Sequence, residues 1–202
     1  MSSMSLEVLE AIPRAMAAAI APVFVQPTRD RYVRYLSAMV HYTRESRAEL
    51  EHAASSMPTE ELRTLFLQLA REEATHYRLA EADLEALGEA IDSTVPKEVL
   101  AIRLFWMTIP PGQPFQFLGA LFALENVARE LALGAEALLE RLGLEASHTR
   151  FIVAHLSTDD DHGAAIGAAC RQYWEAEAPS ILAGAERASE RWVAMHLELL
   201  DE

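Results

Sequence analysis

Apolar residues recur every three or four positions along most of this chain, which is the spacing of amphipathic helices. The pattern predicts a first long helix over about residues 28–55 and a second over about 59–88. A shorter helix is predicted over about 97–108 and a fourth over about 114–142. A fifth over about 145–177 and a last one from about 179 onward complete the set. No segment alternates apolar and polar residues as a strand does, so we expect an all-α fold.

Helix-capping and helix-breaking residues mark several of these boundaries. Thr28 and Thr59 stand where a side-chain oxygen can cap a helix start. Gly88 stands where the second helix is expected to end, as glycine commonly does. Pro179 or Ser180 is predicted to open the last helix.

The N-terminal stretch from Ile12 to Val25 is apolar and superficially similar to a signal peptide. However, the residues before it include Glu7 and Glu10 and no Lys or Arg, whereas a signal peptide begins with a positively charged region. We therefore expect residues 1–27 to form an arm or short helix packed on a helical core over 28–202. Because there is no repeat or linker, residues 1–202 are expected to be a single domain.

Charge and cysteine content narrow the classes of partner and compartment. The chain has 202 residues and a net charge of −14, from 31 acidic and 17 basic side chains. An acidic surface repels phosphate groups, so neither nucleic acid nor a membrane is an expected partner. Cys170 is the only cysteine, so no disulfide can form within the chain, and we expect a cytoplasmic protein.

The second predicted helix carries a carboxylate and an imidazole that are expected to face inward. Glu73 and His76 stand three residues apart and are neighbours on a helix surface. Leu69 and Ala80 continue the same face, so the pair is expected to point inward rather than to form a surface pair. Glu72 lies four residues before His76 and can also reach it, so the spacing leaves both carboxylates as candidates.

The fourth predicted helix carries a carboxylate within its apolar stripe. Glu125 falls among Leu118, Leu121, Phe122, Ala128 and Ala132. A lone carboxylate there is costly unless a partner compensates it. Both a metal ion and Arg129, one turn further on, are candidates for that partner.

The fifth predicted helix places three metal-binding residue types on one narrow face. At about 100° per residue, Asp159 lies about 40° from His155, and His162 about 20° on its other side. Asp160 and Asp161 point elsewhere. The face is either a metal-binding surface or a set of ion pairs.

Helical di-iron proteins commonly combine Glu-x-x-His pairs on two helices with single Glu residues on two others. The sequence offers three carboxylates and three imidazoles as candidate ligands, namely Glu73, His76, Glu125, His155, Asp159 and His162. Mixed nitrogen and oxygen ligands with vacant positions suit iron or manganese better than structural zinc. Residues 28–202 are therefore expected to be a metal-binding helical core.

These segments resemble the haem-oxygenase-like di-iron oxidases and oxygenases, which are also described as iron-containing redox enzymes. The resemblance lies in residues 72–76 running into 83–88, in 122–125, in the His-x-x-x-Asp-x-x-His string of 155–162, and in 41–43. It covers about residues 30–200 and implies a bundle of about seven helices that often forms a homodimer. It also implies two iron ions, or one iron and one manganese, held by the six candidate ligands.

The same resemblance implies O₂-dependent oxidation of a small organic substrate of the amine, amino acid or fatty acid type, with or without an external electron donor. Members of the family can take a further ligand from the first long helix, where His41, Glu45 and Glu49 are all candidates. The substrate pocket is predicted to include Met39, Tyr42, Phe66 and Phe122.

Two other classes of function stay open. One is a metal-free enzyme of the same fold, such as thiaminase II or the pyrroloquinoline-quinone biosynthesis oxidase. Thiaminase chemistry needs a cysteine nucleophile, and Cys170 lies about 80° from the His162 face. The other is a non-enzymatic iron-binding helical protein. His52, His148 and His196 are expected at the surface.

Overall fold

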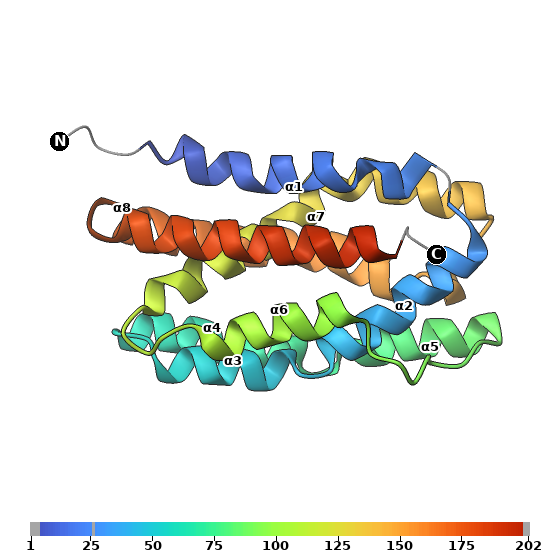
Figure 1. The fold of residues 1–202 in the computed structure, drawn as a ribbon, viewed down its shortest axis with the longest axis horizontal. Coiled ribbons are helices and arrows are strands. Elements are labelled where there is room, and N and C mark those ends of the chain that lie inside the picture. The colour runs from blue at the N-terminus through green and yellow to red at the C-terminus, as the bar shows by residue number, and fades with distance from the viewer. Residues whose placement is uncertain (1–4, 26, 200–202) are drawn as a thin grey trace.

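The computed structural model describes residues 5–25 and 27–199, and the side chains of 157–161 lie outside that description. The helices are α1 (Glu7–Val25), α2 (Arg29–Thr43), α3 (Ser46–Ser55), α4 (Glu60–Glu72), α5 (Tyr77–Leu87), α6 (Lys97–Thr108), α7 (Pro114–Leu142) and α8 (Arg150–Glu198). Short 3₁₀ turns, η1 (Glu73–Thr75) and η2 (Ala146–His148), precede α5 and α8. No strand occurs among the described residues, so the all-α prediction is confirmed (Figure 1).

The local boundary signals identify several helix ends correctly. The Thr28 side chain accepts a hydrogen bond from the Arg31 amide at 3.2 Å, and Thr59 caps α4 in the same way. Gly88 ends α5 with a φ of 75°, a left-handed conformation that glycine adopts without strain. The bounds of α6 and α7 agree with the predicted helices over 97–108 and 114–142.

The first two long helices that the sequence predicts are each divided in the structure. The first is split into α2 and α3 at Arg44 and Glu45. The second is interrupted by η1, where the His76 amide donates to the Glu73 carbonyl at 3.2 Å. The apolar stripe continues across both breaks, so periodicity could not reveal them. The second break lies at the candidate ligands themselves.

Helix α8 doubles back on itself. A straight helix of its 49 residues would be about 70 Å long, yet Phe151 near its start and His196 near its end both contact Tyr35. Their ring centroids lie 6.2 and 6.0 Å from that of Tyr35. Pro179 lies inside α8 and cannot donate a backbone hydrogen bond, which accounts for a sharp bend. The predicted boundary at Pro179 or Ser180 is therefore wrong, because the helix bends in this region instead of ending.

The helices surround one continuous cluster of buried apolar side chains, from Leu9 to Leu199. In Figure 1, α1 lies beside α7 and α8 on one side, and α3 to α6 lie on the other. The arm or short helix predicted over residues 1–27 is thus a helix of 19 residues, and Leu9, Met16 and Ile20 lie on its buried stripe. By length and composition alone, α1 is also long and apolar enough to cross a membrane.

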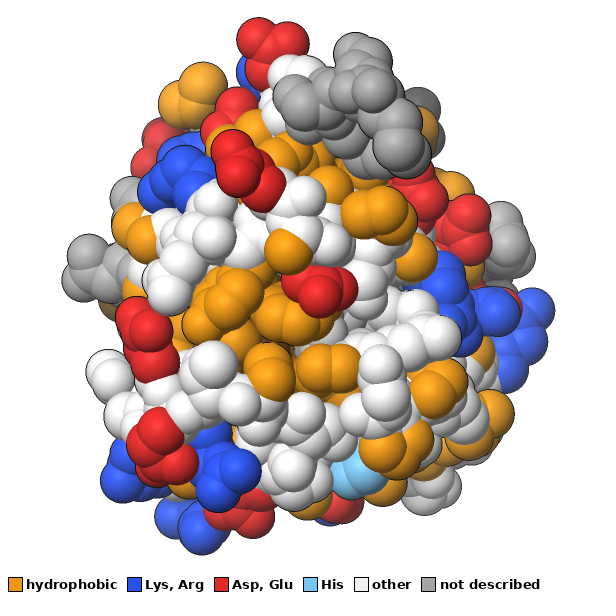
Figure 2. Space-filling model, turned by 90° about the vertical axis from the view of Figure 1, so that its left-hand side faces the viewer, with side chains coloured by type: hydrophobic (Ala, Val, Ile, Leu, Met, Phe, Trp, Pro, Cys, Tyr) orange, Lys and Arg blue, Asp and Glu red, His pale blue; other side chains and the backbone are white. Residues whose placement is uncertain are grey.

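Figure 2 shows the end of the molecule where α8 turns back, which is at the left of Figure 1. Hydrophobic side chains are visible in the middle of this face, with acidic and basic side chains around them. The excess negative charge of the chain is therefore not gathered into one patch on this face.

Glycines allow α7 and α8 to approach one another closely. A Cβ atom at Gly119 would overlap the Ile181 carbonyl oxygen, and one at Gly184 would overlap the Gln116 carbonyl oxygen. Further along the same contact, a Cβ at Gly163 would lie 2.8 Å from the side-chain oxygen of Asn126. This contact holds the helix that carries Glu125 against the helix that carries the two candidate histidines.

We expect Gly119→Ala to lower the free energy of unfolding by about 3 kcal/mol, because the overlap with backbone atoms forces the helices apart. Gly134→Ala on the same helix is the matched control, since its Cβ would meet only the Phe24 ring at 3.6 Å. That control should be neutral or stabilising by up to ~1 kcal/mol, because Ala favours helix. Urea unfolding measures both, and equal losses would contradict the close contact.

Candidate metal centre

Glu73, His76 and His155 converge at one point between the two sides of the bundle. Glu73 comes from η1, His76 from the start of α5 and His155 from the first arm of α8. One donor atom from each lies within 4.8 Å of the others, and the two imidazole centroids are 4.9 Å apart. Glu73 is only 8% exposed. This set of donors has the size and composition of a site for one transition-metal ion.

The contact between His76 and Glu73 tests whether these residues fit a cation. His76 Nδ1 lies 2.6 Å from a Glu73 carboxylate oxygen, yet it has no hydrogen-bond partner. A buried polar nitrogen without a partner costs free energy. When a nitrogen and a carboxylate oxygen lie this close without a hydrogen bond, their arrangement is that of two ligands of the same metal ion. The residues therefore fit a bound metal.

His155 is oriented by its own helix. Its Nδ1 lies 2.8 Å from the Phe151 carbonyl oxygen and therefore donates to it. This leaves Nε2 with a free lone pair, the arrangement that metal-binding histidines commonly adopt. Burial lowers the pKa of His155 and so favours the neutral form that a metal requires.

A second group of donors surrounds His162. Its Nε2 lies 2.8 Å from Glu72, while its Nδ1 lies 3.3 Å from Glu125 and 3.9 Å from Glu73. The hydrogen bond with Glu125 is the largest cause that raises the pKa of His162 to about 9. The imidazolium thus supplies positive charge to three carboxylates. A metal ion bound by the same groups would displace that proton.

Glu125 lines the same cavity as Glu73 and His155, and burial raises its pKa. Its partner is His162 rather than Arg129, which instead lies 3.8 Å from Glu130. The Arg129 alternative is therefore wrong.

Both carboxylates left open by the sequence take part in these contacts. Glu73 lines the cavity, whereas the Glu72 side chain is 40% exposed and reaches His162 from outside. Asp159 belongs to α8, but its side chain lies outside the described residues.

The three candidates from the first long segment are placed differently. His41 contacts the Asp92 carbonyl oxygen at 2.7 Å, and Glu45 lies 3.9 Å from Arg103. Glu49 is buried and lines the cavity with Glu73, Glu125 and His155. Burial raises the pKa of Glu49 to about 7, although Arg103 Nε lies 3.5 Å away.

The first arm of α8 is held in register by a buried carboxylate. Asp83 on α5 is fully buried, and its two oxygens accept hydrogen bonds from the Arg150 and Phe151 amides at 3.1 and 2.9 Å. These amides belong to the first turn of α8, where backbone N–H groups have no carbonyl acceptor within the helix. Asp83 therefore fixes the start of the helix one turn before His155.

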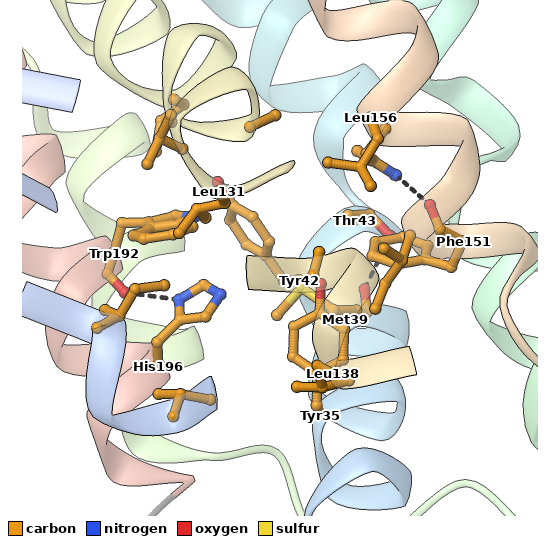
Figure 3. Close-up of a pocket in the computed structure, with 18 of the residues that line it drawn as sticks. Tyr35, Met39, Tyr42, Thr43, Leu131, Leu138, Phe151, Leu156, Trp192 and His196 are labelled. Carbon is orange, nitrogen blue, oxygen red and sulfur yellow. Dashed lines mark hydrogen bonds between the residues drawn. The ribbon is translucent and has the colours of Figure 1, made fainter. Parts of the chain in front are cut away.

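The cavity beside the metal-binding residues has a volume of about 220 Å³ and runs between α1, α2, α7 and α8 (Figure 3). Of the predicted pocket residues, Met39 and Tyr42 line it. Phe66 and Phe122 are not among its described lining residues. Both are buried in the apolar core, and the Phe122 ring lies beside Gly167 of α8.

His196 lines the cavity, so the prediction that it lies at the surface is wrong. It is buried and lines the cavity beside Trp192 (Figure 3). The signal was present in the helical period, because Trp192, Met195 and Leu199 form a buried stripe on the same face. His196 lies one turn after Trp192 and therefore shares its direction.

Comparison with solved structures supports the fold. A Shewanella denitrificans domain of unknown function, described as having a haem-oxygenase-like fold, aligns with a TM-score of 0.87 at 19% identity. The alignment covers 98% of this chain and 93% of that one. The protein therefore has a haem-oxygenase-like fold.

A family described as iron-containing redox enzymes matches residues 33–193. The match spans most of the chain, including all six candidate ligands. The chain belongs to this family. No curated protein sequence matches.

The burial of His196 predicts a pH-dependent contribution to stability. Burial lowers its pKa from 6.5 to about 4, so between these values the unfolded chain binds more protons at this residue. Its contribution is present above about pH 6.5 and is lost as the pH falls toward 4, by up to ~3 kcal/mol.

We expect the free energy of unfolding of the wild type to fall relative to that of His196→Phe between pH 7 and pH 4. Comparing the two proteins cancels the titration of the carboxylates that they share. Urea unfolding at several pH values measures this difference. Parallel pH curves would show that His196 keeps its ordinary pKa in the folded protein.

Proposed function

We propose that the protein is a non-haem di-iron oxidase or oxygenase that uses O₂ to oxidise a small organic substrate. The observation that carries the proposal is the convergence of Glu73, His76 and His155, with His76 Nδ1 buried and without a hydrogen bond. Membership of an iron-containing redox family supports iron as the metal. An iron and manganese pair would suit the same ligands.

The two groups of donors correspond to two metal positions. Glu73, His76 and His155 would hold the first ion. Glu125 and His162, with Glu72 or Asp159, would hold the second. From the first long segment, Glu49 is the candidate that lines the cavity, so we propose it as the further carboxylate in place of His41 or Glu45.

Iron bound here would supply the electrons for O₂ activation, and carboxylate ligands can adjust their binding as its charge changes. The chain supplies the geometry. The Phe151 carbonyl orients His155, and Asp83 fixes the start of α8. The apolar cavity beside the metals provides a dry space in which a substrate of the amine, amino acid or fatty acid type could lie.

The metal-free alternative with a cysteine nucleophile has little support. Cys170 is fully buried, does not line the cavity, and burial raises the pKa of its thiol to about 12. A reactive cysteine needs a thiolate that the substrate can reach. The homodimer, the electron donor, the cytoplasmic location and the absence of nucleic-acid or membrane partners stay predictions.

Loading with ferrous iron under anaerobic conditions, followed by O₂, tests the proposal. We expect about two irons per chain and a transient visible absorption band after O₂ is added. His155→Ala and His162→Ala should each lower the bound iron to about one per chain or less, because each removes a ligand of a different ion. His41→Ala is the matched control and should retain both irons.

Failure to take up iron would contradict the proposal, as would unchanged iron binding in both His155→Ala and His162→Ala. Two irons without any response to O₂ would identify a non-enzymatic iron-binding protein instead.

A further inference from the structure

His196 offers a hydrogen-bond acceptor in the mainly apolar part of the cavity. His196 is 6% exposed, and its ring lies 3.8 Å from that of Trp192 between centroids. Its Nδ1 lies 2.9 Å from the Trp192 carbonyl oxygen and therefore carries the proton that it donates. Nε2 then holds a lone pair, and the structure gives it no partner among the described residues. Figure 3 shows this nitrogen directed toward the open side where Met39 and Tyr42 lie.

This acceptor is separated from the metal centre by aromatic side chains. His155 contacts Phe151, with centroids 4.2 Å apart, and Phe151 contacts Tyr35, which in turn contacts His196. Glu73 and Glu125 lie at the metal end of the cavity, as their contacts with His162 and His155 show. A molecule in the cavity could thus approach the metals with one end and His196 with the other.

The rest of the lining near this acceptor is mainly apolar. It includes Ile20, Phe24, Leu131 and Leu138 from α1 and α7. The volume of about 220 Å³ is below the ~300–1,000 Å³ of typical drug-sized sites, which indicates a small ligand.

We propose that His196 Nε2 accepts a hydrogen bond from an uncharged hydroxyl or amide N–H at the end of the substrate remote from the metals. The substrate would then be a small, mainly apolar molecule that carries this neutral donor at the end remote from the metals, and the term substrate rests on the proposed function. A carboxylate in this place would face the lone pair of Nε2, which repels it. An ammonium group could donate to Nε2, but its charge would lie in the mainly apolar part of the cavity, which is costly.

Two isomers of the same composition test this proposal, namely 1-octanol and heptyl methyl ether. Both have an eight-carbon apolar content and one oxygen, but only the alcohol can donate a hydrogen bond. We expect metal-free wild-type protein to bind the alcohol roughly three- to tenfold more tightly than the ether. This ratio corresponds to the net free energy of one hydrogen bond. Isothermal titration calorimetry measures binding, and the fluorescence of Trp106 and Trp192, which line the cavity, provides a second signal.

In His196→Phe the preference for the alcohol should disappear, while ether binding stays the same. His196→Gln restores an acceptor oxygen and should retain part of the preference. His52→Phe, outside the cavity lining, is the control and should keep the full preference. Thermal unfolding confirms that each variant is folded, and His196→Gln provides a second test of the acceptor if His196→Phe does not fold.

Equal binding of the two isomers to the wild type would overturn the inference, as would an unchanged preference in folded His196→Phe. The assay uses neither iron nor O₂, so its failure is distinguishable from failure of the proposed function. If the protein loads two irons but binds the two isomers equally, the proposed function still stands and the hydrogen-bonding role of His196 is contradicted.

Discussion

The burial of several carboxylates around few cations is the constraint on which this site depends. The side chains of Glu49, Glu73 and Glu125 are 7%, 10% and 14% exposed. Arg103 pairs with Glu49, while His162 contacts Glu72, Glu73 and Glu125, and His76 also lies against Glu73. Buried charges are costly without full compensation. Divalent cations at this point would compensate these carboxylates and also give His76 Nδ1 a partner.

The fold brings these groups together through backbone features that lie next to them. The η1 turn begins at Glu73, and Asp83 fixes the start of α8 close before His155. Gly163, next to His162, allows close contact with Asn126, which itself follows Glu125. The conformation of the backbone and the position of the ligands are therefore coupled at each of these points.

The sequence predicted the features that depend on local signals. Thr28 and Thr59 cap their helices as expected, and the spacing of Glu73 with His76 and of His155 with His162 points each pair inward. Features set by contacts between distant segments escaped prediction. The apolar stripe gave no sign of the η1 turn or of the break at Arg44, and a Pro179 signal could not distinguish a bend from a helix start. The helical period of α8 indicates the burial of His196, whereas its place in the cavity also depends on the fold-back of α8 onto Tyr35.

Anomalous diffraction at the iron edge, from crystals of the protein loaded anaerobically with ferrous iron, tests the central claim most directly. We expect two peaks per chain, one bounded by Glu73, His76 and His155, and another beside Glu125 and His162. Peaks only at surface carboxylates, or a loaded crystal in which His76 Nδ1 contacts no metal, would contradict it.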